Sequence, residues 1–250
     1  MFVFGSGVLL GQRTDIANAT PINFGLIQDV SLDFSFDTKQ LYGQNQFPVA
    51  LGRGKGKITC KAKMARVSGI AFANLFFGLS TSVGELLTSF GEGPSSIPTT
   101  PYQITVSHAA TFVDDYGVIN AATGLPFTRV ASAPAAGQYS VNTGTGVYTF
   151  SSADNVSGIS VLISYTYTVT TAGTQQIAVA NQLMGTTPTF QAQFYTTFQG
   201  LPLNFKAYQC VASKLNFATK LDDFTIPEMD FDLFANAAGN IGNFSFGEVS

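Results

Sequence analysis

Apolar and polar side chains alternate with a period of two in segments 25–37 and 53–64. In the first segment, Leu32, Phe34 and Phe36 alternate with serines and aspartates. The second segment carries basic residues along one side, namely Arg53, Lys55, Lys57, Lys61 and Lys63. Because successive side chains of a strand point to opposite faces, each segment is predicted to be a strand with one apolar and one charged face.

More strand-like runs follow residue 176, and the last of them again has a charged face. Its acids are Glu228, Asp230 and Asp232, which alternate with apolar residues. Between 67 and 76 the apolar residues are spaced as in a helix, and Gly78 is suited to end it. The pattern predicts an all-β fold with one short helix and no βαβ units.

The middle of the chain has the character of a separate module. At 250 residues the chain could form one large β domain or a domain with a second module. The stretch GEGPSSIPTTP at 91–101 has the composition of a linker, and short strand candidates separated by turns follow it to about residue 171. We therefore predict a host β domain in two parts, 1–90 and 176–250, with an immunoglobulin-like β-sandwich module inserted at 91–175.

The composition favours a surface that is covered by a partner. Charged residues make up 11% of the chain, against roughly 25% in an average soluble domain, and phenylalanine occurs 23 times. A phenylalanine-rich core in a monomer is the alternative explanation. No apolar run is long enough to span a bilayer, and a net charge of −3 argues against a general nucleic-acid binder. Both cysteines lie in strand-like segments, which favours buried thiols over a disulfide.

Residue patterns typical of enzymes are weak in this sequence. The single histidine, His108, has no ligand-type or nucleophile motif around it. The run GRGKGK at 52–57 lacks the spacing of a phosphate-binding loop and leads into a strand. The pairs Asp114–Asp115 and Asp222–Asp223, the latter with Glu228, could supply carboxylates for glycoside hydrolysis, but acids beside turns are usually only solvated. We predict a non-enzyme without metal or cofactor.

The charged strand faces allow two interpretations. The basic face of 53–63 could pair with the acidic faces at 33–37 and 228–232 inside one sheet, each pair contributing on the order of 0.2–1 kcal/mol. Alternatively, these faces could meet a neighbouring subunit or line a channel, where charge sets register and partner choice. Both can hold at once.

The order of these elements resembles the tail tube (major tail) proteins of long-tailed bacteriophages. The resemblance lies in the acidic-faced strand, the segment LYGQNQFPVALGRGKGKITCKAK, the short helix SGIAFANLFFG and the carboxyl-terminal runs CVASKLNF and DDFTIPEMDFDLFAN. It covers about 25–80 and 180–248. The inserted module is a weaker match to the extra β domain that tube subunits often carry outside the tube.

This resemblance implies two roughly orthogonal sheets flanked by a helix, with six copies closing into a ring. The rings would stack into a hollow tube through which DNA passes during ejection. A long loop at 39–52 would reach a neighbouring subunit or ring, through Lys39, Leu41, Tyr42, Gln44, Phe47 and Pro48. The bore would be acidic, with Glu228, Asp230 and Asp232 as first candidates and Asp33 and Asp37 as the next. The basic strand departs from that pattern, and we place it against acidic neighbours between subunits.

The implied partners are further copies of the chain and other tail proteins. The latter comprise the tape measure, the baseplate or tip, the terminator and, in a contractile tail, a sheath. DNA would be a partner only in transit, and no membrane would be involved. The protein would lie in the virion tail, and in the host cytoplasm during assembly. The alternative function is a carbohydrate- or receptor-binding β module of a virion surface, which needs exposed aromatic platforms. The chain has no tryptophan, which counts against that alternative.

Overall fold

The chain forms two compact units, of which the second is inserted into the first. The computed structural model describes residues 5–66, 68–171 and 174–247. The host unit comprises Met1–Thr81 and Ile177–Ser250, and the inserted unit comprises Ser82–Gln176. The first boundary therefore lies at Ser82 and not at 91. The linker prediction was wrong over 91–96, because these residues continue strand β6 (Glu85–Ser96).

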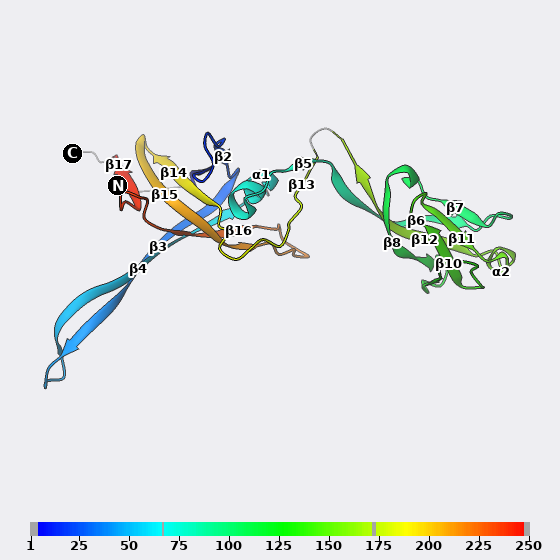
Figure 1. Ribbon diagram of the computed structural model, residues 1–250, viewed down its shortest axis with the longest axis horizontal. Helices are drawn as coiled ribbons and strands as arrows, with labels where there is room; N and C mark the ends of the chain where they lie inside the picture. Colours follow the sequence, from blue (N-terminus) through cyan, green and yellow to red (C-terminus); the bar gives the residue numbers. More distant parts are fainter. Residues whose placement is uncertain (1–4, 67, 172–173, 248–250) are drawn as a thin grey trace. The chain divides into compact units, whose positions relative to one another are not determined.

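The host unit is built on one eight-stranded antiparallel sheet, with the order β2-β1-β14-β15-β16-β4-β3 and with β17 also pairing with β15 (Figure 1). Its strands are β1 (Val8–Arg13), β2 (Ile22–Asn23), β3 (Ile27–Tyr42), β4 (Pro48–Met64), β14 (Thr189–Phe198), β15 (Leu201–Asn216), β16 (Glu228–Leu233) and β17 (Gly242–Phe246). The all-β prediction is thus confirmed for the host unit.

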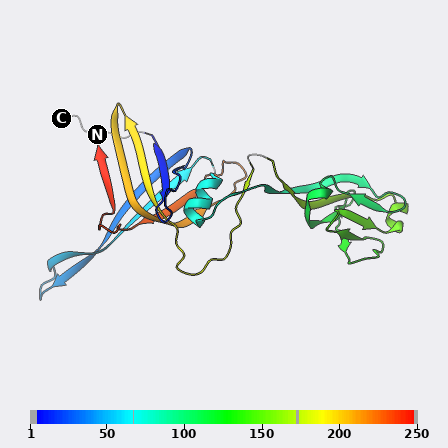
Figure 2. The same ribbon diagram turned by 45° about the horizontal axis from the view of Figure 1, so that its top comes forward.

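Strand β15 joins the two halves of this sheet. One edge of β15 pairs with β14, whereas its other edge pairs with β17 near its start and with β16 near its end. The apolar faces of the two halves meet, as in the contact between Phe34 of β3 and Phe244 of β17, whose ring centroids lie 6.0 Å apart. Figure 2 shows β14 and β15 standing across the direction of β3 and β4. The architecture is sandwich-like, but it is one folded sheet and not the two separate sheets that were predicted.

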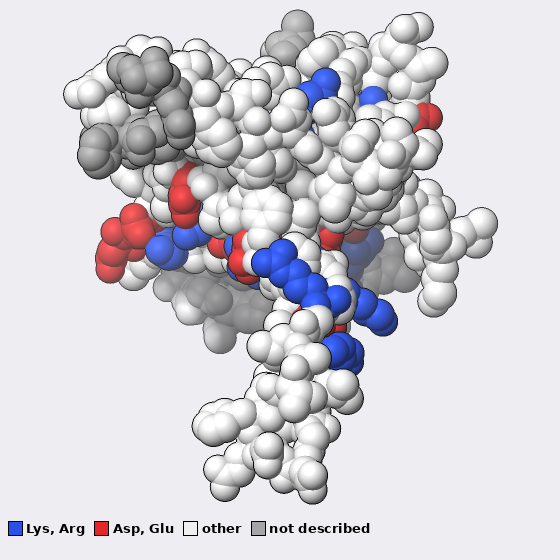
Figure 3. All heavy atoms as spheres, turned by 90° about the vertical axis from the view of Figure 1, so that its left-hand side faces the viewer, with Lys and Arg blue, Asp and Glu red and all other residues white. Residues whose placement is uncertain are grey.

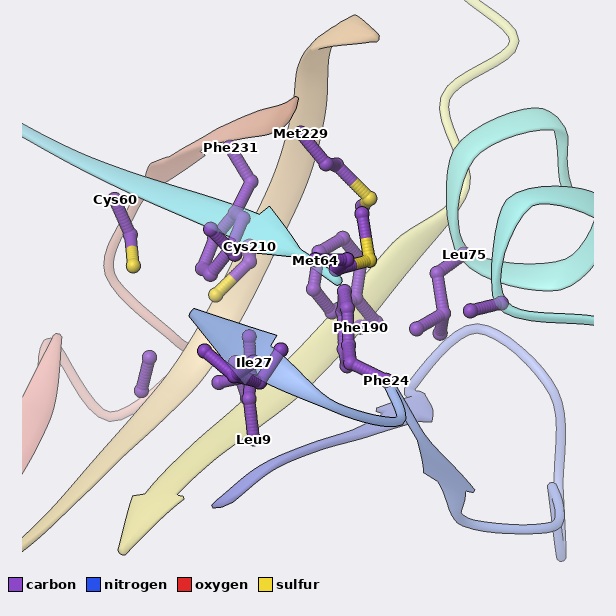
Figure 4. Close-up of a cluster of buried hydrophobic side chains, with 14 of the residues drawn as sticks. Leu9, Phe24, Ile27, Cys60, Met64, Leu75, Phe190, Cys210, Met229 and Phe231 are labelled. Atoms are coloured by element: carbon purple, nitrogen blue, oxygen red, sulfur yellow. The ribbon is translucent and has the colours of Figure 1, made fainter. Parts of the chain in front are cut away.

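The host core lies between the two halves and beneath a short helical segment (Figure 4). Helix α1 (Gly69–Ala71) continues as one π-helical stretch, Phe72–Phe77, which places Leu75 in this core. The side chain of Ser68 accepts a hydrogen bond from the Ala71 backbone and caps the start. Gly78 ends the segment with φ +69°, a left-handed conformation that favours glycine. The helix prediction is confirmed, although Val67 lies outside the described residues.

Both cysteines belong to the host core. Cys60 of β4 and Cys210 of β15 are buried free thiols, as their positions in apolar strands predicted. Burial, together with the nearby charge of Asp230, raises the pKa of Cys60 to about 12. The Cys60 thiol therefore stays protonated at neutral pH.

The inserted unit packs two small sheets around its own core. One sheet has the order β6-β12-β8 and the other β7-β11-β10-β9. Its strands besides β6 are β7 (Gln103–Thr105), β8 (Phe112–Asn120), β9 (Thr128–Arg129), β10 (Gln138–Asn142), β11 (Val147–Phe150) and β12 (Ser160–Val169). The chain enters and leaves this unit through the paired β5 (Ser82–Val83) and β13 (Gln175–Gln176). The predicted small sandwich is present, together with a 3-10 turn, Ala109–Thr111, and an unpredicted helix, α2 (Ser152–Val156). Among the described residues, no helix is long and apolar enough to cross a membrane.

Candidate assembly surface

Residues 35–57 form a two-stranded ribbon, here called the arm. Within the described residues, β4 pairs with β16 from Ile58 to Lys63, and between Pro48 and Lys57 its partner is β3 alone. The ribbon extends beyond the rest of the host sheet (Figure 1). The prediction of a loop over 39–52 was wrong, because Lys39 pairs with Gly52 and Tyr42 with Pro48. The turn is confined to 43–47, which holds Gln44 and Phe47.

The end of the arm is apolar and lies in solvent. The exposed fractions of Leu41, Tyr42, Phe47, Val49 and Leu51 are 63%, 56%, 79%, 65% and 68%. No charged residue occurs between 40 and 52. A two-stranded hairpin is at best marginally stable in water, and clustered exposed apolar side chains mark interaction surfaces. The end of the arm therefore has the properties of an interaction surface.

Two apolar side chains at the root of the arm were expected to face the core. Phe34 and Phe36 lie on the apolar side of β3, but their exposed fractions are 44% and 47%. The other half of the sheet covers this side only in part, through the contact between Phe34 and Phe244. The guanidinium of Arg53 sits 4.7 Å from the ring centroid of Phe36. This cation–π contact and the cross-strand pairs are the local interactions at the root of the arm.

Most of the charged side chains predicted on β3, β4 and β16 share one face of the host sheet, here called the charged face. Arg53 is an exception, because a bulge in β4 turns it to the side of Phe36. Across these strands Lys63 lies in register with Asp29 and Glu228, and Lys61 lies in register with Ser31 and Asp230. One step further, Thr59 lies between Asp33 and Asp232. Figure 3 shows basic and acidic side chains gathered near the root of the arm. The structure thus brings the basic strand and most of the candidate bore acids together within one subunit.

The pairs on this face are long or exposed. The Nζ atom of Lys57 is 3.4 Å from an oxygen of Asp232, and the Nζ atom of Lys63 is 3.6 Å from an oxygen of Asp29. Thr59 donates a hydrogen bond of 2.7 Å to Asp232. Exposed pairs of this kind contribute roughly 0–1 kcal/mol each. Among the described residues, Arg53 and Lys55 form no ion pair, so the root of the arm keeps unpaired positive charge.

Asp230 differs from the other acids of the charged face. It is 8% exposed, and its cross-strand neighbours are Lys61 and Lys214. Within the described part of the chain, its Oδ1 atom has no hydrogen-bond partner. A buried polar atom without a partner costs on the order of 1–3 kcal/mol. Asp230 is therefore a less suitable bore residue than Glu228 or Asp232, which are partly exposed.

The residues considered for catalysis are not brought together. His108 stacks on Tyr167 with ring centroids 3.8 Å apart. Asp115 accepts hydrogen bonds from two tyrosines, and Asp223 pairs with Lys220 on the surface. Over the described ranges, no group of three or more histidines, cysteines and acids is placed to hold a metal ion.

A feature of the inserted unit that the sequence did not predict is a pair of bulges opposite Ser164 of β12. Strand β6 bulges at Phe90 and Gly91, and β8 bulges at Tyr116 and Gly117. The backbone amide of Gly91 donates to the Ser164 hydroxyl over 3.0 Å. Both rings are exposed, Phe90 by 89% and Tyr116 by 66%. Bulges redirect side chains, and these two place exposed aromatic residues on the strands that flank Ser164 on either side.

No protein-family model matches the chain, and no curated protein matches it. The function proposed below is accordingly inferred from the residues and from the geometry of the two units.

Proposed function

We propose that this chain is a structural subunit that assembles with copies of itself into rings stacked as a hollow tube. The observation that carries this proposal is the arm, whose apolar end is exposed in the single chain. The sequence resemblance specifies the assembly further, as the hexameric tail tube of a long-tailed bacteriophage. In that role the protein would act without catalysis, in the virion tail, with DNA passing through the bore.

The edges of the host sheet support closure by neighbouring copies. The sheet ends at β2 on one side and at β3 on the other, and β3 is 16 residues long. A long exposed edge strand is a template for pairing with another chain, and soluble proteins normally protect such edges. If β3 of one copy lies against the other edge of the next, a closed ring removes the exposed edges. Such a head-to-tail contact generates a ring when the rotation closes.

The charged face bears on how DNA would move through such a tube. If this face lines the bore, DNA meets acids that alternate with Lys57, Lys61 and Lys63, a mixed surface and not a purely acidic one. Pairing within the sheet engages part of the positive charge, as in the contact between Lys57 and Asp232. Pairing of Lys57 and Lys63 with acids would weaken their attraction for phosphates, whereas Arg53 and Lys55 at the root of the arm stay unpaired in the portion of the chain that the structure describes.

The direct test is negative-stain microscopy of the purified protein, together with its mass in solution. We expect rings or tubes with a central hole, assembled without nucleotide or metal. A uniform 26.5 kDa monomer at high protein concentration and in every salt condition would contradict the proposal.

Replacing Leu41 and Leu51 together by serine is expected to abolish rings and tubes while leaving the subunit folded. Both side chains are exposed in the single chain, so the free energy of unfolding should change by no more than about 0.5 kcal/mol for each. The matched control replaces Leu183 and Leu221 by serine, which are 85% and 96% exposed but lie outside the arm. Tubes that persist in the arm variant, or that vanish equally in the control, would refute the role of the arm.

A second candidate function, supported by the two bulges, is glycan binding by the inserted unit. Phe90 and Tyr116 flank Ser164, and an aromatic face can pack on the C–H face of a sugar while hydroxyls bind its polar groups. The alanine variants of Phe90 and Tyr116 should lose retention on immobilised bacterial polysaccharides. The control variant Val156→Ala should keep its retention on the polysaccharides, although the Val156 side chain is 86% exposed in the same unit. Unchanged retention of both aromatic variants would remove this candidate.

A further inference from the structure

The host unit contains an apolar pocket between the two halves of its folded sheet. The pocket holds about 180 Å³. Its lining includes Leu9, Leu32, Cys60, Phe194, Phe205 and Phe231. Figure 4 shows Leu9, Cys60 and Phe231 in this region of the core. An apolar space that is partly open to water is a favourable site for an apolar side chain, because burying that side chain removes apolar surface from water.

The pocket has the size of one aromatic ring. In another protein, an apolar cavity of roughly 150 Å³ binds benzene. A single aromatic side chain is therefore the kind of group that we expect to enter this pocket.

The arm presents a phenyl group that fits this description. Phe47 lies in the turn at the end of the ribbon and is 79% exposed. Leu41 and Leu51, further along the ribbon, could cover the mouth of a pocket that Phe47 has entered. The lining also lacks charged residues, and so does the arm between 40 and 52. The two surfaces therefore match in chemistry as well as in size.

Phe47 cannot reach the pocket of its own chain. Cys60 lines the pocket and belongs to the same strand, β4, that begins at Pro48. At about 3.3 Å per residue, the extended strand holds Phe47 roughly 40 Å from Cys60. We propose that Phe47 of one copy fills this pocket in the next copy. This inference rests on the proposed self-assembly and names the residue and the cavity that make the contact.

Such a contact is directional. Each copy offers one arm and one pocket on different parts of its surface. An open row of copies joined by this contact therefore has a free arm at one end and a free pocket at the other. Burying one phenylalanine side chain contributes about 1.5–3 kcal/mol, which corresponds to roughly a tenfold to hundredfold change in affinity. Phe47→Ala should therefore raise the protein concentration needed for assembly by about that factor. Phe224→Ala, at a ring 87% exposed in the same unit, should leave it unchanged.

The first test uses the absence of tryptophan from the sequence. Phe47→Trp places a single fluorescent reporter at the end of the arm. We expect its emission to shift to the blue and its quenching by acrylamide to fall when the protein assembles. A matched Phe224→Trp reporter should show neither change. If the protein assembles while the reporter at 47 stays accessible to acrylamide, the pocket has another occupant and the inference is wrong.

The second test uses the native thiol in the pocket. The variant Phe47→Cys is assembled and then oxidised with copper phenanthroline. The new thiol should form a disulfide with Cys60 of the next copy, so that two thiols are oxidised to one disulfide while the reagent is reduced. Peptide mapping should find the 47–60 link, and adding Cys60→Ser should abolish it. A 47–47 link in place of the 47–60 link would overturn this inference but leave the proposed function standing. Failure of the unaltered protein to assemble would instead remove the proposed function.

Discussion

Replacing Asp115 by alanine is expected to destabilise the inserted unit by about 3–5 kcal/mol. The Asp115 carboxylate accepts hydrogen bonds from the hydroxyls of Tyr139 and Tyr148, over 2.8 and 2.9 Å. It also lies 3.4 Å from the Arg129 guanidinium, and its side chain is 2% exposed. Burial and the Asp115 charge raise the pKa of both tyrosines, which keeps the hydroxyls protonated as donors. The substitution would leave two buried hydroxyls without an acceptor.

Hydrogen exchange of the intact chain, read by mass spectrometry, would locate this loss. Amides of the inserted unit should open more readily, while those of the host unit should keep their protection. Asp114→Ala is the matched control, because Asp114 is the adjacent acid and lies exposed on the surface. If Asp115→Ala behaves like that control, the carboxylate does not organise the core of this unit.

The strands of the host sheet could be predicted wherever the sequence has one buried face. Along β4, Ile58, Cys60 and Ala62 are buried. Lys57, Lys61 and Lys63, which alternate with this buried set, stay on the charged face. Period-two alternation reports this difference directly, and it therefore predicted the strand and the shared face of Lys57, Lys61 and Lys63. The bulge that turns Arg53 to the other side could not be predicted in this way. The acids of β16 could be placed for the same reason.

The arm could not be predicted in this way because neither of its faces is buried. Between Lys39 and Leu51 apolar side chains occur on both faces, so the segment shows no alternation and was taken for a loop. These residues form a strand because they pair with β3, and a local sequence pattern does not report such pairing. The sequence resemblance nevertheless named Leu41, Tyr42 and Phe47 as contact residues, and all three side chains are exposed in the single chain.

Two features of the inserted unit could not be predicted from the sequence, for other physical reasons. The Gly- and Pro-containing stretch from 91 to 96 has the composition of a linker, but β12 supplies it with hydrogen-bond partners through two bulges. The network at Asp115 joins residues from β8, β10 and β11 that are far apart in the sequence. Pattern and spacing describe local preference, and neither can report which distant hydroxyls share one carboxylate.

Replacing Phe190 by alanine is expected to destabilise the host unit by about 3–5 kcal/mol. Phe190 of β14 is completely buried, and its ring centroid lies 5.5 Å from that of Phe231 in an edge-on contact. Removing the ring leaves a cavity at a position where β14, β15 and β16 meet. In hydrogen exchange, the amides of the host unit should lose protection while those of the inserted unit keep it. Asp115→Ala should give the opposite result.

The two variants should also separate folding from assembly. The arm is continuous with β3 and β4, and these strands are held by the core that contains Phe190. Tubes should therefore fail to form, or form only at lower temperature, in Phe190→Ala. Asp115→Ala should assemble normally, because neither the arm nor the pocket belongs to the inserted unit. Phe224→Ala removes an exposed phenylalanine and should assemble like the unaltered protein. If Phe190→Ala forms tubes as stable as those of the unaltered protein, assembly does not depend on this core.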